Sequence, residues 1–133
     1  TGEQQPETDH AIEKEHSTSG NSNNEFYRDA TGNGYFSYEM KTNSETDLCL
    51  LVRYWGAEWG GRRLDIYIDD EKLLTEDNTG RWNQSRFFDV EYGIPRRMVE
   101  GKDKIRVKFQ SLPGNTAGAV YFIRLLKQSQ SRN

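Results

Sequence analysis

The segment Tyr54–Arg63 carries the residues with the clearest potential for chemistry. It places two tryptophans and two arginines around three glycines, and Trp82 and Asn83 form a second, shorter group of the same kind. Flat aromatic rings stack on the apolar faces of sugar rings, while carboxylate, amide and guanidinium groups hydrogen-bond sugar hydroxyls. These residue types therefore predict carbohydrate binding on loops, with the candidates Trp55, Glu58, Trp59, Arg62, Trp82, Asn83 and Asn115.

Groups that could support catalysis are scarce. A serine triad needs a histidine base, and the only histidines, His10 and His16, lie in a polar stretch far from any Gly-x-Ser-x-Gly signature. The single cysteine, Cys49, excludes an internal disulfide or a zinc site of several thiolates, and its apolar surroundings favour a buried small side chain. Carboxylates such as Asp65 and Asp89 alternate with apolar residues, which favours a solvated face.

Glu13 and Glu15 are the only candidates for a metal site. Their spacing projects both carboxylates from the same side of a strand, which could suit calcium. Two carboxylates supply only part of the six to eight oxygen ligands that calcium takes. The expectation is therefore no cofactor, with calcium as the single weak alternative.

Alternation of apolar and polar residues dominates from Tyr35 onward, and it predicts β-strands. Residues 119–126 are apolar on both faces apart from Arg124, which is typical of a central strand. Pro95 and Gly101 bracket one short helical turn. The predicted inward sets are Phe36, Tyr38 and Met40; Leu48, Leu50, Val52 and Tyr54; Leu64, Ile66 and Ile68; Phe88, Val90 and Tyr92; and Ile105, Val107 and Phe109.

The fold prediction is all-β, an antiparallel β-sandwich or jelly roll of about eight to nine strands with at most one short helical turn. The polar N-terminal part contributes two of these strands, near residues 12–16 and 26–30, and its composition predicts a loop over residues 17–24. We expect a single domain over residues 9–127, with frayed ends at 1–8 and 128–133.

Alternate connections of an antiparallel sandwich emerge at the same end, so the loops can be sorted by counting strands. One end should collect residues 31–34, 56–62, 77–83 and 112–118, and the other should collect residues 42–45, the turn at Asp70 and residues 93–102. The tryptophan-bearing loops thus share one end. A tryptophan there could instead plug the sandwich with its N–H bonded locally. That alternative suits Trp55, at a strand end, better than ligand contact, whereas both roles stay open for Trp59 and Trp82.

Charge and hydropathy exclude several classes of partner. The formal net charge is −3, and neither the acidic N-terminal part nor the near-neutral remainder is basic enough for a nucleic-acid surface. No apolar run approaches the length of a membrane-spanning helix.

Several motifs share their order and spacing with one family: Pro6–His10, Ser17–Gly20, Arg28–Ala30, Gly34–Met40, Leu51–Gly56, Asp65–Asp69 and Val107–Phe109. Over residues 6–127 the chain resembles the C-terminal accessory domain of bacterial β-L-arabinofuranosidase-like proteins, which are related to glycoside hydrolase family 127. More distantly, it is similar to galactose-binding-like jelly rolls such as carbohydrate-binding module family 6. An early Glu-x-Glu strand often helps to hold a structural calcium there; Glu13-Lys14-Glu15 matches it, but no late Asp in the final strand completes the pattern.

The resemblance implies a non-catalytic accessory module of a periplasmic or extracellular polysaccharide-degrading enzyme. The module would pack on the parent's catalytic domain, weakly bind a plant-type glycan, or do both. The family's cysteine nucleophile and its zinc, bound by further cysteines and a glutamate, belong to the parent's helical barrel, so this chain, with Cys49 alone, inherits no activity. The alternatives are a purely structural or protein-interaction sandwich and, less favoured, an independent glycosidase with paired carboxylates.

Overall fold

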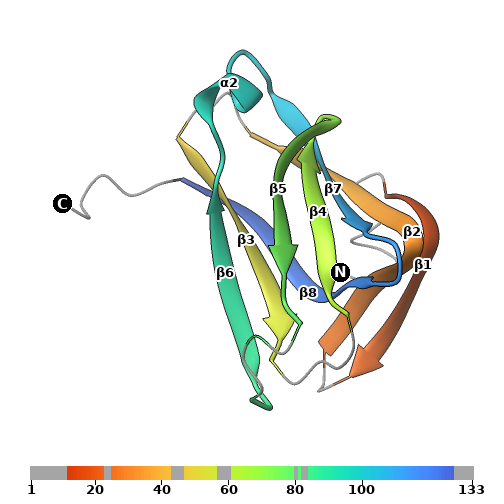
Figure 1. The fold of residues 1–133 in the computed structure, drawn as a ribbon. Helices are drawn as coiled ribbons and strands as arrows, with labels where there is room; N and C mark the ends of the chain where they lie inside the picture. The colour runs from red at the N-terminus through yellow and green to blue at the C-terminus, as the bar shows by residue number, and fades with distance from the viewer. Residues whose placement is uncertain are drawn as a thin grey trace.

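Antiparallel strands and one four-residue helix make up the computed structural model, which describes residues 12–22, 25–42, 47–56, 61–79, 81 and 84–127 (Figure 1). The predicted all-β class, strand number and single helical turn are confirmed. The ends expected to fray, 1–8 and 128–133, lie outside the described residues. The elements are β1 (Glu13–Ser22), β2 (Glu25–Lys41), β3 (Leu48–Trp55), β4 (Arg63–Ile68), β5 (Glu71–Asp77), β6 (Phe87–Gly93), α2 (Arg96–Val99), β7 (Lys104–Ser111) and β8 (Thr116–Lys127).

The strands hydrogen-bond in the order β5-β4-β7-β2-β8-β3-β6, with β1 pairing along β2. This path curls, so that β4 and β5 lie in front of β3 and β8 in Figure 1 and a two-layered jelly roll results. We call the layer of β5, β4, β7 and the second half of β2 sheet I, and the layer of the first half of β2, β8, β3 and β6 sheet II. β8 lies between β2 and β3, which confirms its predicted central place.

β2 belongs to both sheets and turns the corner between them. Its residues 28–31 pair with β8, and its residues 35–41 pair with β7. Gly32 and Asn33, between these stretches, have positive φ angles of 56° and 65°. The partner strand β1 follows the bend through a register shift at His16, whose φ is 50°. A Cβ on Gly34 would lie 2.5 Å from the Glu15 carbonyl oxygen, so the corner requires glycine there.

Two predicted loops are therefore wrong. Residues 17–22 are the second half of β1, and residues 31–34 are the corner of β2. Both stretches are polar, and strand pairing along them satisfies the backbone N–H and C=O groups without needing apolar side chains. Composition alone indicates that these side chains are exposed, but it does not indicate that the backbone pairs with a neighbouring strand.

The core lies between the two sheets and consists mostly of the predicted inward sets. Val52, Ile66, Val107 and Phe109 are fully buried. The Phe36 and Phe109 rings stack 5.2 Å apart across β2 and β7. Period-two alternation thus identified the inward faces because each sheet has one buried face.

The sorting of loops is also confirmed at the end that carries α2. Asp69 and Asp70 form a tight turn with φ angles of 48° and 67°. Lys102 Nζ lies 2.8 Å from Asp69 Oδ2, and Arg97 pairs with Glu71. In the described part of the chain no helix is long and apolar enough to cross a membrane.

We predict that Gly34→Ala lowers the free energy of unfolding by about 3 kcal/mol, because the new methyl group would overlap the backbone of β1. Urea denaturation measures the loss. Gly101→Ala is the control: its φ of 75° is unfavourable for alanine, but the methyl group meets nothing within 4 Å, so about 1 kcal/mol is expected. Equal losses in both variants would contradict the packed corner.

Candidate functional site

The described residues of three connections meet at the end of the jelly roll opposite α2, as the sorting of loops predicts. The connections are residues 56–62 between β3 and β4, residues 78–86 between β5 and β6, and residues 112–115 between β7 and β8. Backbone hydrogen bonds join them: Gly56 N donates to Arg86 O (2.9 Å), Asn78 N donates to Arg62 O (3.0 Å), and Thr116 N donates to Gly61 O (2.9 Å). We call these three connections the loop end.

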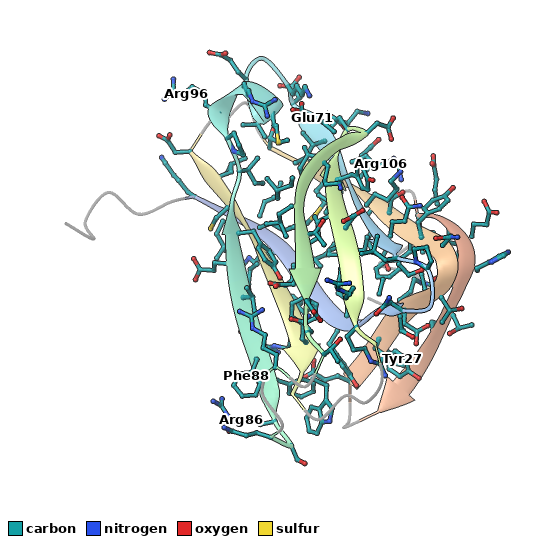
Figure 2. All side chains as sticks on the ribbon, viewed as in Figure 1. Tyr27, Glu71, Arg86, Phe88, Arg96 and Arg106 are labelled. Carbon is teal, nitrogen blue, oxygen red and sulfur yellow. The ribbon has the colours of Figure 1, made fainter. Side chains whose placement is uncertain are left out.

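Arg86 and Phe88 close one side of the loop end and lie together in Figure 2. The Arg86 guanidinium carbon sits 3.9 Å from the centroid of the Phe88 ring. A Cβ on Gly56 would lie 2.5 Å from that ring, so glycine lets the loop approach it. The contact gives this side of the loop end a flat cationic surface held by an aromatic ring.

Thr79 bridges two of the loops. Its Oγ1 accepts a hydrogen bond from Arg62 N (2.8 Å), and its own N–H donates to Asp77 Oδ1 (3.0 Å). The hydrogen bonds that the Thr79 backbone N–H and the Thr79 side chain make to Asp77, with a smaller contribution from Arg63, lower the pKa of the Asp77 carboxyl group below its ordinary value.

A chain of polar groups that begins at the buried Tyr54 hydroxyl anchors Asn78 and Arg81 from inside the sandwich. The Tyr54 and Tyr92 hydroxyl oxygens are 2.9 Å apart, and the Tyr92 hydroxyl donates to Glu76 Oε2 (2.8 Å). Because Tyr92 gives its proton to Glu76, Tyr54 donates to Tyr92. Arg81 Nη1 then donates to Glu76 Oε2 (2.8 Å) and to Asn78 Oδ1 (3.1 Å). Burial is the main cause that raises the pKa of both tyrosines, so both remain neutral donors.

The predicted site residues divide into three groups. Arg62 and Asn115 lie at the loop end, and both are half-buried. The Asn115 amide supports the loops, since its Nδ2 donates to Pro113 O (2.9 Å) and its Oδ1 accepts from Arg63 N (3.3 Å). Trp55 lies on the outward side of β3, edge-to-face on Phe87 with centroids 5.1 Å apart. The remaining candidates, Glu58, Trp59, Trp82 and Asn83, lie outside the described residues.

Glu13 and Glu15, the candidates for a calcium site, gather no further ligand in the described part of the chain. Glu13 and Glu15 are exposed on β1, and Glu13 Oε2 lies 3.7 Å from the Arg106 guanidinium group. Within the described ranges, no three His, Cys, Asp or Glu side chains gather where they could hold a metal ion. The spacing of the two glutamates predicts that their carboxylates lie on one side of a strand, but it identifies no further calcium ligand.

The carboxylates interpreted as a solvated face are partly buried or paired. Asp65 is only 6% exposed, because Thr75 of the edge strand β5 donates to its Oδ1 (2.5 Å) and Lys72 Nζ lies 3.7 Å from its Oδ2. Asp89 accepts two hydrogen bonds from Arg53. The expectation was therefore wrong for Asp65, since a neighbouring strand covers it.

Sequence reasoning missed the roles of Tyr92, Glu76 and Thr79. Tyr54 and Tyr92 were predicted only as inward residues of β-strands. Their hydroxyl groups were the available signal, because a buried tyrosine hydroxyl needs a polar partner. Glu76 and Thr79 gave no comparable signal, since polar residues at a strand end are common in turns.

We predict that Thr79→Val raises the pKa of Asp77 part of the way back toward its ordinary value, because the side-chain hydrogen bond is lost and the backbone one remains. Carboxyl NMR titration measures it. A lowered pKa stabilises the fold above the ordinary pKa, and this stability disappears as pH falls through the lowered pKa. Thr79→Ser, which keeps the hydroxyl group, is the control. If the pKa of Asp77 is the same in Thr79→Val as in the wild type, the side-chain hydrogen bond of Thr79 to Asp77 is ruled out.

We predict that Tyr92→Phe lowers the free energy of unfolding by about 2 kcal/mol, because it leaves Glu76 and the buried Tyr54 hydroxyl without their shared partner. Amide hydrogen exchange in residues 78–86 should also accelerate. Tyr67→Phe, at a half-buried ring on the outer side of sheet I, should leave both measurements unchanged. Wild-type exchange in Tyr92→Phe would show that the network does not anchor this loop.

Solved structures share this fold. A family 35 carbohydrate-binding module from Clostridium thermocellum has a TM-score of 0.64 at 11% identity, covering 88% of this chain and 92% of that chain. A family 36 module in complex with calcium and xylotriose has a TM-score of 0.63 at 15% identity, covering 90% and 96%. In an exo-β-1,3-galactanase from Phanerochaete chrysosporium (TM-score 0.60, 12% identity), 90% of this chain covers 28% of the enzyme.

Comparison of the sequence with protein-family models identifies a family, whereas comparison with curated proteins does not. No curated protein matches the chain. The model of DUF6805, a family of unknown function, matches residues 1–126, nearly the whole sequence and every strand described above. The chain belongs to the DUF6805 family.

Proposed function

We propose that the chain is a non-catalytic carbohydrate-binding accessory module that binds glycan at the loop end. The observation that carries the proposal is the convergence of three hydrogen-bonded connections at one end of the jelly roll. Their sequences contain Trp59, Trp82 and Asn83, the residue types that stack on and hydrogen-bond sugars. The fold shared with carbohydrate-binding modules supports the proposal.

The frame of the loop end suits recognition. Backbone hydrogen bonds, the Thr79 bridge and the buried tyrosine network hold the described residues of its loops before any ligand arrives. A site that is already ordered loses less conformational entropy on binding. Weak, specific binding of a polysaccharide segment is the behaviour that such a site supports.

The parent of the module is, on this proposal, a periplasmic or extracellular polysaccharide-degrading enzyme related to glycoside hydrolase family 127. The motifs between Pro6 and Phe109 support that link. The module would keep the enzyme near a plant-type glycan and pack on its catalytic domain.

We predict that arabinan-, galactan- or xylan-derived oligosaccharides at millimolar concentration change the tryptophan fluorescence and the amide shifts of residues 56–62 and 78–86. Trp82→Ala should weaken the binding about tenfold through loss of stacking. Tyr67→Phe, at a half-buried ring on the outer side of sheet I, leaves every tryptophan in place and is the control. If no amide at the loop end shifts, the proposal is wrong. If the purified chain hydrolyses aryl glycosides, the chain is an enzyme instead.

A structural or protein-interaction role is the second candidate. Such a domain should expose apolar side chains that a neighbour covers. Phe26 and Phe122 are 42% and 36% exposed, which favours some contact on sheet II. The side chains around these exposed rings determine which class of partner makes that contact.

A further inference from the structure

The outward side of sheet II carries aromatic rings from four strands. We call Tyr27 of β2, Trp55 of β3, Phe87 of β6 and Tyr121 and Phe122 of β8 the aromatic face. Register accounts for their side: Val52 and Tyr54 point into the core, so Arg53 and Trp55 point outward together with their cross-strand partners Phe122 and Phe87. A register shift beside Tyr54 turns Tyr121 to the same side.

The rings of the aromatic face form a continuous row. Trp55 packs against Phe87 at 5.1 Å, Phe87 against Tyr121 at 4.9 Å, and Tyr121 against Tyr27 at 5.5 Å. The Tyr27 ring, labelled in Figure 2, lies over Gly20 of β1 so closely that a Cβ there would fall 2.7 Å from its hydroxyl oxygen. Rings fixed at edge-to-face angles have little freedom to lose when a ligand stacks on them.

Arg53 lies between two rings of the aromatic face. Its guanidinium carbon is 5.6 Å from the centroids of both Phe87 and Phe122. Nε donates to Asp89 Oδ1 (2.8 Å), Nη2 donates to Asp89 Oδ2 (3.2 Å), and Nη1 lies 3.6 Å from Glu25 Oε2. Asp89 is the main cause that raises the pKa of Arg53. A fixed planar cation and two carboxylates thus lie among apolar rings at the surface.

We propose that the aromatic face is a second carbohydrate-binding site, which extends the loop end along sheet II. Asp and Glu are depleted in protein interfaces, whereas this surface holds the carboxylates of Asp89 and Glu25 beside Arg53. Sugars need apolar rings for their C–H faces and nearby acceptors for their hydroxyl groups. Each oxygen of Asp89 accepts one hydrogen bond from Arg53 and retains a lone pair for a hydroxyl group.

Charge and continuity specify the class of glycan. The carboxylates of Glu25, Asp89 and Glu91 outnumber the guanidinium groups of Arg53 and Arg124 on this side, which disfavours uronate or sulfated chains. Trp55 ends β3, and the next residue, Gly56, begins the loop end. A neutral chain of several sugars held at the loop end can therefore continue onto the aromatic face, a reading that rests on the proposed function.

The test is an NMR titration of the whole chain with neutral hexasaccharides from xylan, arabinan and galactan, with their monosaccharides, and with an oligogalacturonate. A neutral hexasaccharide should shift the amides of Tyr27, Arg53 and Phe122 as well as those of the loop end. Monosaccharides and the oligogalacturonate should not shift the amide signals of the aromatic face. Phe122→Ala should weaken hexasaccharide binding about fivefold, whereas Leu126→Ala, further along β8 on the same side, should change it less than twofold.

The possible failures are distinguishable. If hexasaccharides shift only the loop end and Phe122→Ala binds like wild type, the second site is overturned while the proposed function stands, and docking of a folded protein becomes the explanation of the exposed rings. If no glycan shifts any amide, both proposals fall together. The wild-type shift map needs no variant, so a folding defect in Phe122→Ala cannot decide the result.

Discussion

The corner of β2 is the constraint on which the rest of the structure depends. One strand supplies an inner edge to each sheet, so the two layers cannot form separately. The corner is possible because Gly34 lets the backbone of β1 approach within contact and because Gly32 and Asn33 adopt positive φ angles. Ser111 Oγ donates to Gly34 O (3.3 Å), which ties the corner to the end of β7, beside the loop end.

The buried tyrosine network carries this order outward to the loops. Tyr54 belongs to the core, while Arg81 reaches solvent, and Tyr92 and Glu76 connect them in a single chain of donors and acceptors. Such a network is stable only when every member is satisfied. No buried side-chain nitrogen or oxygen among the described residues lacks a hydrogen-bond partner. Asn78 and Arg81, at the start of the connection between β5 and β6, are therefore tied to the core as well as to each other.

Alternation of apolar residues predicted the strands from Phe36 onward, because each has one face in the core and period two reports that burial directly. It could not predict β1 beyond His16, where strand pairing orders polar residues without burying them. Counting strands predicted which loops meet, since an antiparallel order fixes the end at which each connection lies. It gave no information on Thr79 or Glu76, whose roles depend on side-chain geometry. The place of Trp55 at a strand end favoured a plug of the sandwich, whereas the register of β3 places its ring on the outward side of the sheet against Phe87.

The register between β3 and β8 also explains a feature of β8 that its central position in the sheet does not explain. Its inward residues, Val120 and Ile123, pack on the core as expected. A two-layered jelly roll buries only one face of each strand, so the middle of a sheet does not require apolar residues outside. Tyr121 and Phe122 nevertheless point outward, one buried under its ring neighbours and the other 36% exposed. An apolar outer face on a central strand therefore indicates a surface with something to contact, and the carboxylates of Asp89 and Glu25 beside Arg53 suit a hydroxyl-bearing ligand.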